Sequence, residues 1–295
     1  MATMQLQRTI KGEVTFEGTG LHTGRPVFMR LRPAPRDTGI VFRRLDKGVT
    51  VRANLQSVTD TAFATTISSG GARIKTVEHL LATAAGLGID NMLVELTGPE
   101  VPIMDGSSAA FTESLLRTGI AKQASNKPYI RINKPVFFSE GQAEIAVMPY
   151  EGRRISYHIA FNHSLVGEQR MSLDLCTESF IEELAPARTF GFLKDVEYLK
   201  SLGLAKGGSL ENAVLLSETG VLNASGLRFR DEFILHKMLD FVGDISLVGF
   251  PVMGHFIVSR SGHSSNIKFL HMLLGSPDSW EMVSGVGATM QQAIA

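Results

Sequence analysis

Runs of β-branched and aromatic residues, separated by Gly and Pro, open the chain and return after its midpoint. Such runs are typical of β-strands. They predict strands over residues 8–16, 27–31, 39–44, 91–96, 129–138, 143–149 and 154–161, with further apolar segments at 246–250 and 255–259. We therefore expect strands near the start of the chain and again in its second half.

A helical period replaces this pattern elsewhere. Val77, Leu80 and Ala84 recur at the spacing of one helix face, and Gly86 suits the end of that helix. The predicted helices span residues 76–86, 107–117, 233–242 and 264–274, together with part of 178–203. The two glycines within residues 206–209 predict a flexible loop.

The chain of 295 residues suffices for two domains, and its composition turns polar between residues 121 and 128. We predict a linker there, between a first domain over residues 1–123 and a second over 128–295. The two halves also match at a shift of 157 residues, where His79, Gly86, Ser107 and Ser108 coincide with His236, Gly243, Ser264 and Ser265. The order of the predicted elements is the same in both stretches. The sequence therefore predicts an α+β fold from an internal duplication.

Composition narrows the possible functions. The 29 Lys and Arg residues balance the 29 Asp and Glu residues, which argues against a nucleic-acid or other polyanion binder. Cys176 is the single cysteine, so a disulfide within the chain and a thiolate-cluster metal site are excluded. The sequence shows no secretory signal and no apolar run long enough for a membrane span. We expect a cytoplasmic monomer.

His236, Asp240 and Asp244 follow one another at intervals of four within a predicted helix. A helix places the first two one turn apart on one face, where an imidazole and a carboxylate can chelate one divalent ion. Single motifs of this kind often match by chance. The alternative is a helix with solvated charges and a histidine packed against a strand.

Glu78 and His79 are neighbours on another predicted helix, so their side chains point about 100° apart. A metal ligand and an adjacent base can then reach the same water molecule. Hydrolytic zinc sites use three protein ligands and a carboxylate base. His79, His236 and Asp240 would complete such a set. The alternative is a helix with an exposed glutamate and a half-buried histidine.

His263 lies at a Gly turn that opens a predicted helix. An acidic neighbour such as Asp244 could hold its imidazole protonated, as a general acid requires. Capping of the helix by Ser264 or Ser265 is compatible with that role. The remaining histidines lack comparable partners in sequence and are interpreted as structural or surface residues: His22, His158, His163, His255 and His271.

Together these patterns resemble the metal-dependent UDP-3-O-acyl-N-acetylglucosamine deacetylases of lipid A biosynthesis, the LpxC family. Six matching segments occur in the family's order over essentially the whole chain. They are residues 18–22 (GTGLH), 76–80 (TVEHL), 102–107 (PIMDGS), 187–192 (ARTFGF), 236–240 (HKMLD) and 261–263 (SGH). Six separate matches are far more specific than any one of them.

The resemblance implies two α+β domains, each a layer of helices against a small sheet and each with an insert. The second insert, expected within residues 189–215, would help to form an apolar passage for an acyl chain. The metal ligands implied are His79, His236 and Asp240. The implied cofactor is Zn²⁺, and Fe²⁺ could occupy the same ligands.

The resemblance also implies roles in catalysis. Glu78 would be the general base, and His263, oriented by Asp244, a cationic acid or electrostatic group. Thr189 would help to stabilise the oxyanion, and Lys237 would lie beside the substrate.

Further residues match substrate contacts of the family. Phe161, Phe192 and Asp195 match positions near the uridine, and Phe190 is expected to bind substrate as well. Arg260 occupies a position near the diphosphate where many members have Lys. Residues 60–65 depart from the family's sequence near the metal.

The activity implied is removal of the N-acetyl group from UDP-3-O-acyl-N-acetylglucosamine, which gives a free amine and acetate. The sequence does not decide whether Glu78 or His263 protonates the leaving amine. Two alternatives remain at this point. One is a non-catalytic module that binds a nucleotide-sugar lipid, and the other is a deacetylase of another N-acyl sugar.

Overall fold

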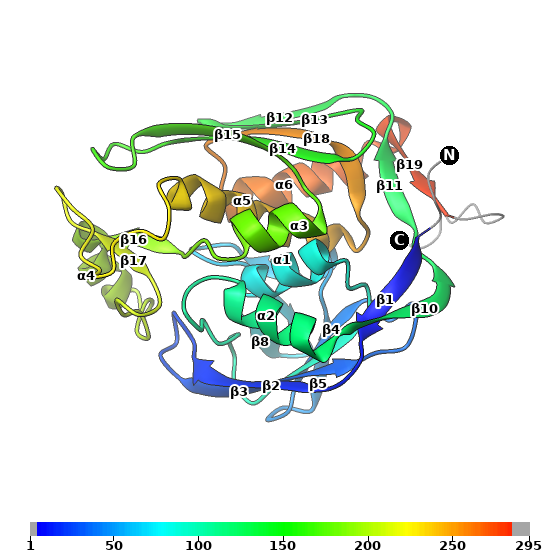
Figure 1. Cartoon of the computed structure of the whole chain (residues 1–295), viewed down its shortest axis with the longest axis horizontal. Coiled ribbons are helices and arrows are strands. Elements are labelled where there is room, and N and C mark those ends of the chain that lie inside the picture. The colour runs from blue at the N-terminus through cyan, green and yellow to red at the C-terminus, as the bar shows by residue number, and fades with distance from the viewer. Residues whose placement is uncertain (1–4, 285–295) are drawn as a thin grey trace.

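Two β-sheets form outer layers of the molecule, and the main helices lie between them (Figure 1). The computed structural model describes residues 5–284. The first sheet has five strands in the order β2-β3-β9-β4-β5. These strands are β2 (Val14–Thr19), β3 (Pro26–Pro33), β4 (Ile40–Arg44), β5 (Val49–Arg52) and β9 (Met92–Leu96). The predicted α+β class is confirmed.

The second sheet has seven strands, and β18 (Val252–Ser259) is its central strand because it pairs with β13, β14 and β11. The other strands are β11 (Tyr129–Ile132), β12 (Val136–Glu140), β13 (Ala143–Met148), β14 (Arg153–Ala160), β15 (Glu168–Asp174) and β19 (Trp280–Val283). Each of the two main sheets therefore takes its strands from one half of the chain.

The two sheets share one topology. Five strands of the second sheet are connected as β12-β13-β18-β14-β15, which parallels β2-β3-β9-β4-β5 in the first. In both, one neighbouring pair is parallel, β9 with β4 and β18 with β14, and the remaining pairs are antiparallel. This correspondence is consistent with the predicted duplication. The division into residues 1–123 and 128–295 stays a prediction.

The polar segment predicted to be a linker is a strand instead. Residues Ile120–Asn126 form β10, which pairs antiparallel with β1 (Leu6–Ile10) in a sheet of two strands. None of the β10 side chains is fully buried, so the strand does not need the apolar pattern on which the prediction depended. Backbone hydrogen bonds to β1 form this strand, and they do not depend on the type of side chain.

Other boundaries differ from the prediction in smaller ways. The strand predicted over residues 8–16 is interrupted between β1 and β2, and the strand over 129–138 is interrupted between β11 and β12. Residues Ser246–Val248, in a segment predicted only to be apolar, form a 3₁₀ turn. Further short turns are the 3₁₀ helices Leu55–Ser57 and Pro277–Ser279 and the π-helix Phe180–Leu184, which follows α3 (Thr177–Ser179).

Four predicted helices are confirmed, and they form the interior of the molecule (Figure 1). They are α1 (Glu78–Leu87), α2 (Ala109–Thr118), α5 (Glu232–Ile245) and α6 (His263–Leu274). Nine residues of α1 are buried, so this helix is enclosed on all sides. No helix within residues 5–284 is both long and apolar enough to cross a membrane.

Each half carries an additional small sheet between its fifth strand and its first long helix. In the first half it consists of β6 (Val58–Asp60), β7 (Thr66–Ser69) and β8 (Ala72–Ile74). In the second half β16 (Phe190–Phe192) and β17 (Val214–Leu216) pair in parallel around α4 (Leu193–Ser201). The second unit projects from one end of the molecule (Figure 1).

The contact between α1 and α5 depends on a glycine. A Cβ atom at Gly243 would lie only 2.2 Å from the carbonyl oxygen of Glu78. Gly86, at the equivalent position of α1, is equally restricted, because a Cβ there would lie 2.2 Å from the ring of Phe180. The absence of side chains at these two positions allows the interior helices to approach closely.

We expect Gly243→Ala to lower the free energy of unfolding by about 1–3 kcal/mol, the usual cost of overpacking a core. In a helix alanine is normally more favourable than glycine by about 0.5–1 kcal/mol. A lower free energy of unfolding in the variant would therefore come from the collision with Glu78 and not from helix propensity. The control is Gly191→Ala, because a Cβ at Gly191 meets no atom within 4 Å. Chemical denaturation of both variants measures the difference, and equal stability would contradict the close contact.

Candidate metal centre

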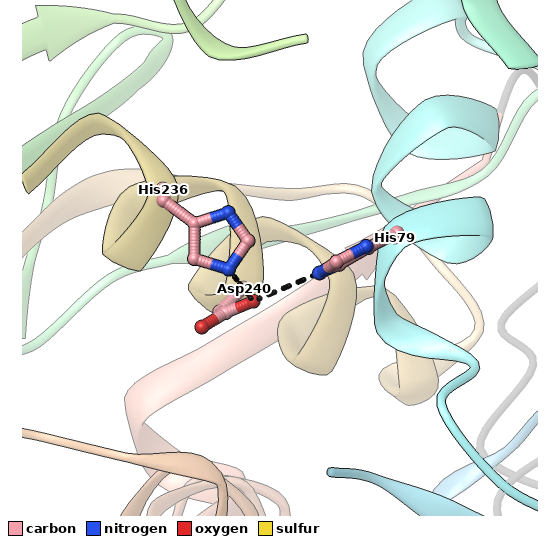
Figure 2. Close-up of side chains that lie close together, drawn as sticks. All are labelled: His79, His236 and Asp240. Carbon is pink, nitrogen blue, oxygen red and sulfur yellow. Dashed lines mark ion pairs between the residues drawn. The ribbon is translucent and has the colours of Figure 1, made fainter. Parts of the chain in front are cut away.

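Three buried side chains from two helices meet beside the start of α1 (Figure 2). His79 belongs to the first turn of α1, and His236 and Asp240 lie one turn apart on α5. Oδ1 of Asp240 is 3.3 Å from Nε2 of His236 and 3.6 Å from Nε2 of His79. Two ligands about 2.1 Å from a tetrahedral ion lie about 3.4 Å apart. The spacing of these atoms therefore suits one shared divalent cation.

The two imidazoles are perpendicular, with ring centroids 5.0 Å apart and an angle of 90° between the ring planes. One ligand atom from each of His79, His236 and Asp240 lies within 4.8 Å of the other two. The structure thus brings together the three residues that the sequence selects from two distant segments.

Neighbouring groups orient these side chains. Nδ1 of His236 lies 3.1 Å from the carbonyl oxygen of Ala187. That carbonyl can only accept, so Nδ1 carries the proton and Nε2 is left as the free ligand atom. Lys237 donates to Oδ2 of Asp240 at 2.9 Å, on the oxygen that does not face the histidines. This leaves Oδ1 directed at both imidazoles.

The charges around this cluster determine its ionisation. Burial lowers the pKa of the His79 imidazole, which keeps it neutral as a metal ligand requires. Burial works against ionisation of Asp240, but His236 and Lys237 outweigh it and hold the pKa of the carboxyl well below its usual range. The set therefore offers two imidazole nitrogens and one carboxylate.

The start of α1 places Glu78 next to the cluster. Thr76, just before the helix, adopts the left-handed conformation with a φ of 58°, and its hydroxyl donates to Glu100 at 2.8 Å. Glu78 is 3% exposed, and one of its oxygens accepts from the backbone N–H of Thr65 at 3.1 Å. Burial raises the pKa of Glu78 to about 8, against the attraction of His263. A carboxylate with a pKa near neutrality suits proton transfer.

His263 faces Glu78 from the start of α6. Its Nε2 is 3.8 Å from Oε1 of Glu78, and its Nδ1 donates to Oδ2 of Asp244 at 2.8 Å. Burial opposes protonation of this imidazole, but the charge of Asp244 and its hydrogen bond outweigh burial and raise the pKa of His263 to about 9. His263 is therefore protonated at neutral pH, as the sequence predicts for an imidazole beside Asp244.

Two further residues hold Asp244, and no sequence motif marks them. The hydroxyl of Thr65 donates to Oδ1 at 2.6 Å, and the amide of Asn266 donates to Oδ2 at 2.8 Å. Thr65 contacts both Glu78 and Asp244, so a residue of the first insert links the two titratable groups. Thr65 ends the segment of residues 60–65, which departs from the family's sequence. That departure is the only feature of the sequence that indicates this position.

Thr189 is placed by backbone hydrogen bonds. Its N–H donates to the carbonyl of Gly106 at 2.8 Å, and its own carbonyl accepts from Val214 at 2.8 Å. Two residues earlier, Ala187 holds His236. The backbone of Thr189 is thereby fixed, and an oxyanion role for its hydroxyl stays a prediction.

Three of the predicted substrate residues form an aromatic cluster. The ring of Phe161 lies 5.6 Å from that of Phe190 and 5.8 Å from that of Phe192. Phe190 also approaches the ligand His236, with a centroid distance of 6.3 Å. His163, which the sequence did not single out, lies 5.2 Å from Phe192. The cluster therefore extends from the metal ligands to the second insert.

Asp195 and Arg260 are exposed. Asp195 lies in the first turn of α4. Arg260 follows β18 in the left-handed conformation, with a φ of 51°, and its N–H donates to His158 at 2.9 Å. These positions leave both side chains accessible, and their contacts with substrate stay predictions.

Comparison with known proteins finds one family. The model of the UDP-3-O-acyl N-acetylglycosamine deacetylases (LpxC) matches residues 7–275. A UDP-3-O-acyl-N-acetylglucosamine deacetylase of Thermodesulfovibrio yellowstonii is 48% identical over 271 residues, which cover 92% of each chain. The enzyme of the same name from Syntrophus aciditrophicus is 46% identical over 283 residues, or 95% of this chain and 90% of the relative.

We expect Asp244→Asn to lower the pKa of His263 by about one unit or more in the metal-free protein, because it removes an opposite charge in direct contact. An NMR titration of the imidazole measures the shift. The internal control is His255, whose pKa is lowered by burial, not by Asp244. An unchanged His263 would contradict its dependence on Asp244.

The same pair makes stability depend on pH. The folded-state pKa of His263 lies above its ordinary value of 6.5. Protonation of His263 therefore stabilises the fold fully below about pH 6.5, and this contribution is lost as the pH rises through about 9. Asp244→Asn should remove most of this dependence in the alkaline range.

Proposed function

We infer the function of this chain from the family to which it belongs, the UDP-3-O-acyl-N-acetylglucosamine deacetylases (LpxC). It is an enzyme, a hydrolase that removes the N-acetyl group from UDP-3-O-acyl-N-acetylglucosamine and releases acetate and a free amine. This reaction belongs to lipid A biosynthesis. The substrate is accordingly a UDP-linked, acylated amino sugar.

The observation that carries the mechanism is the cluster of His79, His236 and Asp240 with Glu78 beside it. The donors are two imidazoles and one carboxylate, all buried. Zn²⁺ takes nitrogen and carboxylate oxygen donors in catalytic sites with three protein ligands. We propose Zn²⁺ as the cofactor, and Fe²⁺ suits the same donors. When bound, the ion would supply Lewis-acid chemistry by acidifying a water and polarising the acetamide carbonyl.

Side chains of the protein carry out the proton transfer, the stabilisation of the oxyanion and the placement of the substrate. Glu78 takes the proton of the water that attacks the acetamide carbonyl, and its hydrogen bond from Thr65 fixes the carboxylate. The hydroxyl of Thr189 stabilises the developing oxyanion, a contribution of about 3–4 kcal/mol for one such donor in other hydrolases. Lys237 holds Asp240 and lies beside the substrate.

Protonated His263 stabilises negative charge on the other side of Glu78. The distance of 3.8 Å between Nε2 of His263 and Oε1 of Glu78 lets both groups reach one substrate atom. Either can hand a proton to the leaving amine. Asp244, held by Thr65 and Asn266, keeps the imidazole oriented for this step.

The second insert binds the remainder of the substrate. Phe161, Phe190 and Phe192 form an apolar wall next to His236, which suits the acyl chain and the uridine ring. Exposed Asp195 and Arg260 supply polar contacts to the uridine and the diphosphate. We further propose that the enzyme acts as a monomer in the cytoplasm, where UDP-linked sugars are available.

The direct test is mass-spectrometric detection of acetate release from the acylated UDP-sugar, before and after chelation. We expect turnover by the metal-loaded protein, loss of turnover after chelation and recovery on addition of Zn²⁺. Turnover that survives complete removal of metal would contradict the mechanism. Substrate binding without acetate release would favour a non-catalytic module, and release only from another N-acyl sugar would redefine the substrate.

Two neighbouring substitutions separate the roles of ligand and base. His79→Ala should lose the metal, because two ligands remain. Glu78→Ala should keep the metal and lose turnover by about 100-fold or more, as expected for a general base. Metal content by mass spectrometry and rates of acetate release measure both effects. Equal loss of metal in the two variants would contradict this division.

A further inference from the structure

A cavity lies between the two halves, at the opposite end of α1 from His79. Its volume is about 510 Å³, within the range of small-molecule sites. The first half contributes Leu81, Ala84 and Ile89, and the second half contributes Ile155, Val252 and Phe256. None of these residues belongs to the metal centre or to the aromatic cluster.

Arg153 supplies this cavity with a charge that has no counterion. It begins β14 and points to the same side as the buried Ile155, because alternate residues of a strand share a face. Among the described residues, its guanidinium forms one hydrogen bond, to the carbonyl of Ala85 at the limiting distance of 3.5 Å. Within residues 5–284 no carboxylate forms an ion pair with it. Burial lowers the pKa of Arg153, and a guanidinium stays charged nonetheless.

The adjacent arginine shows the usual arrangement. Arg154 points to the outer face of the sheet and forms two hydrogen bonds with Asp174, at 2.8 and 2.7 Å. The chain therefore contains a paired and an unpaired arginine at consecutive positions. They differ in the face of the strand that they occupy.

The other charged residues around the cavity are already neutralised or bound. Lys127 pairs with Asp90 at 2.7 Å. Asp37 accepts from Gln7 at 2.6 Å, and Arg52 donates to the carbonyl of Thr38 at 3.1 Å. Three cations and two carboxylates thus line the cavity, which leaves one positive charge in excess. Arg52 is exposed, whereas Arg153 is half-buried beside the apolar lining.

We propose that this cavity binds a small amphipathic carboxylate, with its carboxylate on Arg153 and its apolar part against Leu81, Ile155 and Phe256. A planar guanidinium binds a carboxylate through two parallel hydrogen bonds. A phosphate would need further donors, and Lys127 is occupied by Asp90. The site is independent of the proposed deacetylase mechanism, because it shares no residue with it.

The test is calorimetric titration of the full-length, metal-loaded protein with octanoate. We expect Arg153→Gln to weaken binding about tenfold or more, the loss of one charge-assisted contact. Arg154→Gln is the matched control and should bind octanoate like the wild type. The neutral analogue 1-octanol should bind the wild type more weakly than octanoate does and should not distinguish the two variants.

A folding defect is separated from a binding defect by Arg153→Lys. Lysine keeps the charge beside the carbonyl of Ala85 but cannot form two parallel bonds, so we expect folded protein with intermediate affinity. Three results would overturn the proposal: no binding of octanoate, equal affinity in wild type and Arg153→Gln, or equal affinity for octanoate and octanol. Binding that survives Arg153→Gln would place octanoate at the substrate site.

Discussion

The close crossing of α1 and α5 is the constraint on which the active site depends. Gly243 lies against the carbonyl of Glu78, and a single Cβ there would collide with it. This contact sets the distance between α1 and α5, and hence the distance between His79 and the pair His236 and Asp240. To share one ion, the ligand atoms must match its preferred distances within a few tenths of an ångström. Each helix supplies an incomplete set, so the candidate metal centre forms only where the two halves meet.

Burial and charge act in opposite ways on Glu78 and His263, the two groups proposed to transfer protons. Burial dominates at Glu78 and raises its pKa to about 8. At His263 burial opposes protonation, but the charge of Asp244 and its hydrogen bond together outweigh burial and raise the pKa to about 9. Glu78 thereby becomes a stronger base, and His263 keeps the proton that an acid needs. Thr65 binds both Glu78 and Asp244. A single residue of the first insert therefore couples the positions of the base and of the carboxylate that maintains the acid.

The sequence predicts features that depend on local pattern. The helical period located α1 and α5, and the spacing within each helix selected His79, His236 and Asp240. It could not predict features that depend on long-range contacts. Thr65 and Asn266 belong to no motif, and their role arises because distant segments converge on Asp244. The polar strand β10 was missed for the same reason, since pairing with β1 defines it.

The two ends of α1 contact groups of opposite charge, an acidic side chain at its start and a cation at its end. Its start holds the carboxylate of Glu78, and its end holds the cation Arg153 on the carbonyl of Ala85, which is the favourable arrangement of charges on a helix dipole. A carboxylate in the cavity would draw Arg153 from that carbonyl. The change need not reach His79, because the contact at Gly243 leaves α1 no room to shift against α5. Ligand binding at the cavity and metal binding are therefore separable, even though one helix of ten residues carries both.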